Sequence, residues 1–108
     1  MPKFYKLYMD FFKRNEIVWV MNQEDGMKYI TLYQMLCIEA LKNNNAMLTQ
    51  NIGGHTVPYT VDDIARITGY NKAEIESGLY TLGKVNLVQN VSGIIYIPEI
   101  AGQLANKE

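Results

Sequence analysis

The side chains best suited to chemistry lie between residues 72 and 92, and their types favour binding over catalysis. Two lysines in this stretch could neutralise phosphates, and hydroxyl and amide side chains could reach base edges or phosphate oxygens. Glu74 and Glu76 argue against such contacts because they repel phosphate. Taken singly, each candidate is more typical of solvated surface than of a DNA contact. The candidate DNA-contacting residues are Lys72, Ser77, Tyr80, Thr81, Lys84, Gln89, Asn90 and Ser92.

Residues suited to catalysis or metal binding are few. The chain has one histidine, His55, and one cysteine, Cys37, which together cannot build an ordinary zinc site. His55 has no evident nucleophile or orienting partner, so we interpret it as a loop residue. No paired carboxylates, phosphate-binding loop or nucleophile motif is found. We therefore expect a binding domain that is not an enzyme and has no catalytic residues, no metal site and no cofactor.

The sequence shows no signs of secretion or of insertion into a membrane, which indicates the compartment of the protein. A single cysteine allows no intrachain disulfide, and no signal peptide is visible. Both observations favour a reducing cytosol. No apolar run approaches the ~18 residues needed to span a membrane. We expect a cytoplasmic protein, in the bacterial cytosol or nucleoid, without a membrane partner.

Two helices joined by a tight turn must position the candidate residues. Thr60 is predicted to cap the first helix, and Gly69 to end it, because only glycine takes the left-handed conformation cheaply. Asn71 then opens the second helix, with Glu74 three residues on as in a capping box. The apolar residues that recur at i, i+4 and i+7 on the second helix are Ile75, Leu79 and Leu82. Its opposite face carries the candidate contacts.

A β-hairpin is predicted after the second helix. The pattern changes to that of two strands, Leu87-Val88-Gln89-Asn90-Val91 and Ile94-Ile95-Tyr96-Ile97, which a Ser92-Gly93 turn separates. A helix-turn-helix followed at once by a hairpin is the winged-helix layout and suggests DNA binding. We predict an α+β fold, mainly α: a winged helix-turn-helix with a short β-hairpin wing and a small N-terminal strand. The domain would span residues 1–100, and residues 101–108 would be a tail or the start of a linker to an absent C-terminal region.

The N-terminal half supplies the remaining elements. Alternation over residues 4–9 predicts a short strand, and residues 46–49 could form a second strand beside it. A short helix over residues 16–22 would turn Ile17, Val18 and Trp19 inward, and we interpret Trp19 as a core residue. Residues 50–56 are predicted to form a loop.

A long helix is predicted over residues 27–42, with one broad apolar side. Cys37 lies on that side, which favours a packed, inert thiol. Met35 and Ile38 instead fall within the polar sector. They are either scattered exposed hydrophobes or a dimer interface, in which case the protein would be a homodimer.

The charge distribution gives weak support to DNA binding. The formal net charge is −1 and the sequence pI is about 5.8, unlike the basic balance of a domain that grips phosphates alone. Four basic residues stand against Asp10 within residues 1–14, away from the second helix. This basic N-terminal segment, with Lys3, Lys6, Lys13 and Arg14, could supply phosphate contacts.

Several short strings, taken in order, resemble a known family over nearly the whole chain. They are Lys6-Leu7, Asp10-Phe11-Phe12, Gly26, Leu36, Pro58-Tyr59-Thr60, Ile64-Ala65, Leu82-Gly83 and Gly93-Ile94-Ile95-Tyr96-Ile97. The chain resembles the N-terminal domain of phage replisome organiser proteins, which is related to plasmid replication initiator and DnaD-like N-terminal domains. It departs from that pattern at Lys84-Val85-Asn86, before the hairpin.

The resemblance implies the DNA-binding domain of a replication-initiation protein. Such a protein binds duplex DNA at an origin and helps to assemble the helicase-loading complex, with a helicase loader or helicase as partner of its C-terminal region. Two alternatives share the fold: a winged-helix transcriptional regulator, and a winged helix used only for protein contacts or dimerisation. The acidic residues of the second helix favour the protein-contact alternative.

Overall fold

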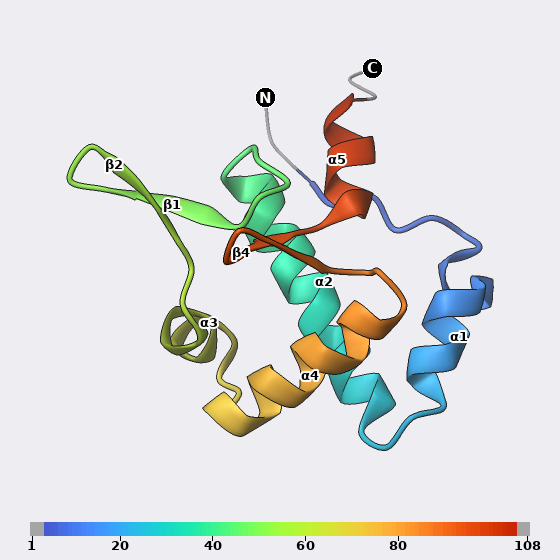
Figure 1. The fold of residues 1–108 in the computed structure, drawn as a ribbon. Helices are drawn as coiled ribbons and strands as arrows, with labels where there is room; N and C mark the ends of the chain where they lie inside the picture. Colours follow the sequence, from blue (N-terminus) through green and yellow to red (C-terminus); the bar gives the residue numbers. More distant parts are fainter. Residues whose placement is uncertain (1–3, 106–108) are drawn as a thin grey trace.

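Helices dominate the computed structural model, which describes residues 4–105. This confirms an α+β fold that is mainly α. The helices are a 3₁₀ helix Phe11–Lys13, α1 Asn15–Met21, α2 Gly26–Lys42, α3 Val61–Thr68, α4 Lys72–Lys84 and α5 Pro98–Ala105. The strands are β1 Thr49–Ile52, β2 His55–Pro58, β3 Gln89–Val91 and β4 Ile94–Tyr96 (Figure 1). None of the helices within residues 4–105 is long and apolar enough to cross a lipid bilayer.

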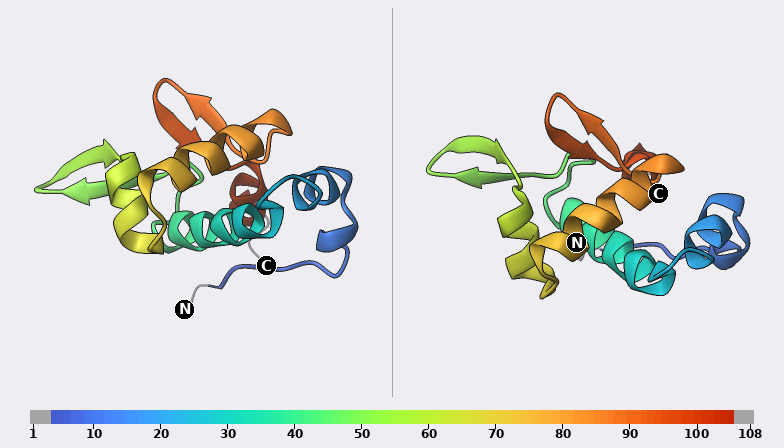
Figure 2. Two further views of the ribbon diagram at one scale, coloured as in Figure 1. Left: turned by 90° about the horizontal axis from the view of Figure 1, so that it is seen from below. Right: turned by 60° about the horizontal axis from the view of Figure 1, so that its bottom comes forward.

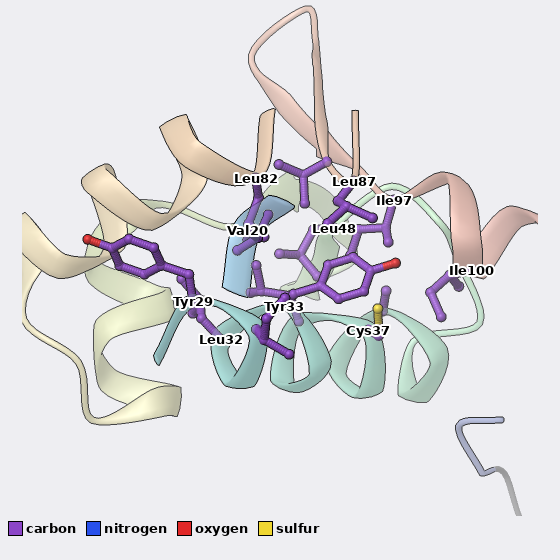
Figure 3. Packing of buried hydrophobic residues seen from close by; sticks show 14 of the residues in the cluster. Val20, Tyr29, Leu32, Tyr33, Cys37, Leu48, Leu82, Leu87, Ile97 and Ile100 are labelled. Carbon is purple, nitrogen blue, oxygen red and sulfur yellow. The ribbon is translucent and has the colours of Figure 1, made fainter. Parts of the chain in front are cut away.

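Helix α2 is the centre of the core. Its apolar side is buried from Tyr29 to Ala40, as the sequence predicts, and Tyr33 and Cys37 are fully covered. Val20 from α1, Leu82 from α4 and Ile100 from α5 lie around it (Figure 3). Because α4 packs on this helix, the position of α2 determines where the outer face of α4 points.

Local capping builds the predicted pair of helices. Thr60 caps α3 in a capping box with Asp63, and Gly69 ends the helix with φ of 82°. Asn71 caps α4, and its capping box with Glu74 is formed in both directions. The predicted order of helix, turn, helix and hairpin is therefore confirmed.

The hairpin after α4 is extended by a third segment. Strands β3 and β4 are antiparallel, with Val91 opposite Ile94, and Met47 bridges to Tyr96 on the other side of β4. The Leu48 N–H donates to the Ile95 carbonyl at 2.8 Å. Residues 46–48 therefore pair with β4, and the prediction that they lie beside an N-terminal strand is wrong.

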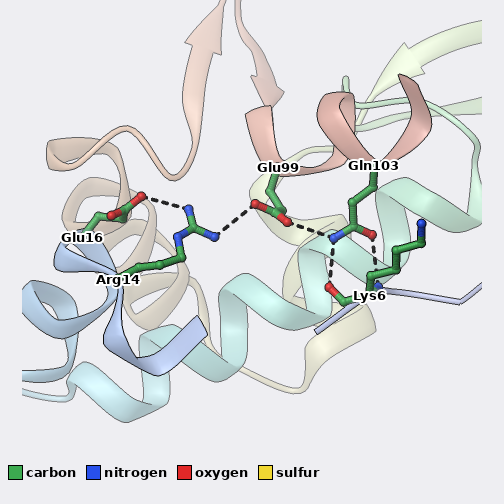
Figure 4. A network of polar contacts seen from close by, with 5 residues as sticks. All are labelled: Lys6, Arg14, Glu16, Glu99 and Gln103. Carbon is green, nitrogen blue, oxygen red and sulfur yellow. Dashed lines mark hydrogen bonds and ion pairs between the residues drawn. The ribbon is translucent and has the colours of Figure 1, made fainter. Parts of the chain in front are cut away.

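The small N-terminal strand is absent from residues 4–9. The side-chain amide of Gln103 in α5 takes the place of a neighbouring strand. It accepts a hydrogen bond from the Lys6 N–H at 3.1 Å and donates one to the Lys6 carbonyl at 2.9 Å (Figure 4). The segment is extended, but its backbone is satisfied by a helix side chain, and so no sheet forms.

A second hairpin replaces the predicted loop at residues 50–56. Strands β1 and β2 pair from Thr49 with Pro58 to Ile52 with His55. Gly53 and Gly54 have φ of 58° and 82°, the two positive values that a type I′ hairpin turn needs. Figure 2 shows this hairpin and β3–β4 projecting as two separate arms.

The interior of α1 differs from the prediction. Ile17 and Val20 are fully buried, whereas Val18 and Trp19 are 36% and 37% exposed. Only one face of this two-turn helix meets α2, and residues 17 and 20 share that face because they are three apart. Trp19 is therefore not a core residue.

The last described helix crosses the predicted domain boundary at residue 100. Helix α5 runs from Pro98 to Ala105, and Ile100 and Gln103 are buried on it. Residues 101–105 thus belong to the fold rather than to a tail, and residues 106–108 lie outside the described part of the chain.

Candidate nucleic-acid interface

Helix α4 presents two distinct faces. Ile75 and Leu82 are fully buried against the core and Leu79 is half-buried, as predicted. The exposed residues of α4 are Lys72, Ala73, Glu76, Ser77, Tyr80 and Lys84. The inward set thus fixes which side chains of α4 reach solvent.

The turn before α4 is tied to the first turn of α2. The Tyr70 hydroxyl donates to the Lys28 carbonyl at 2.7 Å, and the Lys28 ammonium lies 2.8 Å from Glu74 Oε2. The hydrogen bond from Lys28 lowers the pKa of the Glu74 carboxyl, which also accepts the Asn71 N–H. Glu74 is therefore a compensated charge that holds the helix start in place, which the sequence alone did not indicate.

Lys72 has only a loose acidic partner. Its Nζ lies 3.6 Å from Asp62 Oδ1, and both side chains are largely exposed. Exposed ion pairs of this kind contribute about 0–1 kcal/mol, so a phosphate could replace the carboxylate at little cost.

Four of the predicted contact residues come together in one groove. It has a volume of about 420 Å³ and lies between α4 and the β3–β4 hairpin. Lys84 Nζ stands 4.7 Å from the centroid of the Tyr80 ring. The lining residues are Leu79, Tyr80, Gly83, Lys84, Val88, Gln89, Asn90 and Ile95.

The other candidates lie outside this groove. Ser77 is exposed on α4, and Ser92 is exposed in the hairpin turn with φ of 54°. Thr81 is half-buried. It lies one turn after Gly78, the residue at which α4 packs on α2. Asn90 lines the groove but also has a structural role, because its Oδ1 accepts the Gly93 N–H at 2.9 Å and closes the turn.

The N-terminal basic segment has less free charge than its sequence suggests. Both terminal guanidinium nitrogens of Arg14 are engaged, Nη2 with Glu16 at 2.9 Å and Nη1 with Glu99 at 3.1 Å (Figure 4). Lys13 is exposed and Lys6 half-buried. Lys3 lies outside the described residues.

The two residues proposed for a dimer interface lie in different surroundings. Ile38 is 52% exposed and lines an apolar groove of about 440 Å³ with Phe4, Tyr5, Leu41 and Lys42. Met35 is half-buried and does not line this groove.

Sequence reasoning missed a cluster of neutral polar side chains at the base of the β1–β2 hairpin. Its lining residues are Asn43, Asn45, Thr49, Gln50, Asn51 and Thr56. The run Asn43-Asn44-Asn45 is the signal in the sequence that indicates this cluster.

The chemistry of the single cysteine follows from its burial. Burial raises the pKa of the Cys37 thiol to about 12, so the thiolate needed for reactivity does not form near neutral pH. Among residues 4–105, no group of three or more His, Cys, Asp or Glu side chains could hold a metal ion.

The arrangement of an exposed helix beside a hairpin can be compared with known proteins. A family model described as N-terminal phage replisome organiser matches residues 4–108. The chain belongs to this family. Membership gives the domain a replication-related role and confirms the resemblance seen in the sequence. No curated protein and no solved structure matches the chain.

Proposed function

We propose that this replisome organiser domain binds duplex DNA as a winged helix. Helix α4 would enter the major groove and the β3–β4 hairpin would act as the wing. The observation that carries the proposal is the convergence of Tyr80, Lys84, Gln89 and Asn90 on one exposed groove between these two elements. Ser77, Thr81 and Ser92 would contribute at its margins.

The support for a role in replication initiation comes from the family rather than from the groove. In the proposed role the domain binds origin-like DNA and helps to assemble the helicase-loading complex, with a helicase loader or helicase contacted through a further C-terminal region. It would act in the bacterial cytosol or nucleoid, where that DNA lies, and it would have no catalytic activity of its own. A role in transcription has less support, because the family is named for the replisome.

Salt-dependent binding tests the proposal. Fluorescence anisotropy with labelled duplexes should give a log K that falls by about 0.9 per log unit of salt for each phosphate neutralised. Replacing Lys72 and Lys84 with alanine should weaken binding and reduce the slope by about one per lysine.

A matched control is Lys42→Ala, because Lys42 is exposed but lines a different groove. It should leave the slope unchanged. If the folded protein binds no duplex at low salt, the proposal is wrong, and the protein-contact alternative takes its place.

A homodimer is a second proposal, supported by the exposure of Ile38 within an apolar groove. Sedimentation should then show a dimer that Ile38→Glu converts to a monomer, with Met35→Glu as the second interface variant. A wild-type monomer at high concentration would remove the idea.

A further inference from the structure

The groove between α4 and the β3–β4 hairpin has the chemistry of a base-binding slot. Its floor is apolar, formed by the buried Val88 with the half-buried Leu79 and Ile95. At its rim the Tyr80 ring is 67% exposed. An exposed aromatic face beside an apolar floor is the arrangement on which unpaired bases stack.

We propose that this groove holds an unpaired nucleobase, so that the domain binds locally opened DNA in addition to intact duplex. This inference rests on the proposed binding of DNA through the same face. The occupant is a flat group with apolar faces and a polar edge. Such a group becomes accessible when a base leaves the helical stack.

The polar edge of a base meets suitable partners here. Gln89 is exposed, and within residues 4–105 its side-chain amide has no hydrogen-bond partner, so both its donor and its acceptor can face a base edge. Asn90 uses its oxygen for the Gly93 N–H, which leaves its Nδ2 donor for the ligand. The two amides can thus hydrogen-bond a base without reading its identity strictly.

The charge of the groove is complementary to a nucleic acid. Lys84 is its one charged lining residue, and no carboxylate lines it. Lys84 Nζ lies over the Tyr80 ring, 4.7 Å from its centroid, so a base that stacks on this face displaces the ammonium, which can then meet the backbone phosphate of that base. The volume of about 420 Å³ lies within the range of small-ligand sites, roughly 300–1,000 Å³.

Base stacking would also add binding energy to the outer face of α4, which offers few phosphate contacts. The helix has only two exposed lysines, Lys72 and Lys84, and its Glu76 is exposed without an ion-pair partner among the described residues. Phosphate contacts from α4 are therefore few. A stacked base adds binding that does not depend on neutralising phosphates.

The experiment compares an intact labelled duplex, the same duplex with one unpaired thymine, and the matching single strand. Wild-type protein should bind the bulged duplex more tightly than the intact one. Tyr80→Ala should weaken binding to the bulged duplex by about 5- to 150-fold, the range of one lost base–aromatic stack, and should weaken binding to the intact duplex, which offers no unpaired base, by a clearly smaller factor. Tyr80→Phe retains the ring and should retain the preference.

Tyr8→Ala is the matched control, since Tyr8 is an exposed aromatic on the N-terminal segment. Equal affinity for bulged and intact duplex, or equal loss on both with Tyr80→Ala, overturns the base slot. If the intact duplex still binds with a salt slope, the proposed function survives that result. If no DNA binds, the base slot and the proposed duplex binding both fail. If only the bulged duplex or the single strand binds, the base slot is supported and the proposed duplex binding fails.

Discussion

Gly78 lies where α4 packs most closely on α2, and its replacement by alanine gives a sharp test of that contact. A Cβ at residue 78 would stand 2.7 Å from Leu32 Cδ2 and 3.1 Å from Tyr29 Cδ1. Leu32 is fully buried and Tyr29 is nearly so. Neither side chain can move into solvent to make room for the methyl group.

Two opposing effects set the magnitude for Gly78→Ala. Alanine is favoured over glycine in a helix interior by roughly 0.5–1 kcal/mol. An extra methyl group in a packed core costs about 1–3 kcal/mol. We expect a net loss of about 1–2 kcal/mol, which for a domain of this size lowers Tm by roughly 4–16 °C.

The assay is thermal and urea unfolding followed by circular dichroism, with Gly102→Ala as the matched control. Gly102 lies in α5, is exposed, and has no atom within 4 Å of an added Cβ. This control should stabilise by roughly 0.5–1 kcal/mol. In a Leu32→Val background, which removes the colliding Cδ2, Gly78→Ala should become less harmful. Equal stabilisation by both alanines would refute a tight contact between α2 and α4.

Three other predictions concern single groups. The Thr60 N–H and Arg66 hold the pKa of Asp63 at about 2, so its contribution to stability is full above pH ~4 and is lost as pH falls toward 2. Asp63→Asn should flatten the pH dependence of the urea midpoint in that window, and an unchanged slope would contradict this. Burial raises the pKa of the Cys37 thiol to about 12, so this thiol should react with an aromatic disulfide reagent at pH 8 only after guanidinium unfolds the chain. Rapid reaction of Cys37 in the folded protein would contradict a closed core. Gln103→Ala should free the backbone of Lys6 and speed tryptic cleavage there, whereas Gln103→Glu, which keeps an acceptor for the N–H, should speed it less.

Elements specified by local interactions were predictable from the sequence. The caps of α3 and α4 depend on residues three apart, and Gly69 ends α3 by its own conformation. The hairpin after α4 follows from a Ser-Gly turn between two runs with the pattern of β-strands. The Gly53-Gly54 turn was equally local, so the β1–β2 hairpin could have been found from the same kind of signal.

Elements specified by distant partners were not predictable. Residues 4–9 alternate like a strand, but the partner of Lys6 is a side chain 97 positions away. Trp19 is exposed because only one face of α1 meets the core, which a single helix cannot reveal. The groove likewise depends on where β3 lies relative to α4, although four of its residues were identified from the outward face and the hairpin.

The acidic residues near α4 repel DNA phosphates less than their number suggests, because most of their charges are compensated by neighbouring groups. Glu74 faces Lys28, which lies 46 positions earlier in the chain, and Asp63 is held by Arg66 and its own cap. Their charges maintain the two helix starts instead of opposing a phosphate directly. Of the two glutamates on α4, Glu76 remains exposed and unpaired among the described residues, against Lys72 and Lys84. The outer face of α4 is therefore close to neutral with a slight positive excess, and this favours a binding surface that combines a few phosphate contacts with the apolar and amide groups of the adjoining groove.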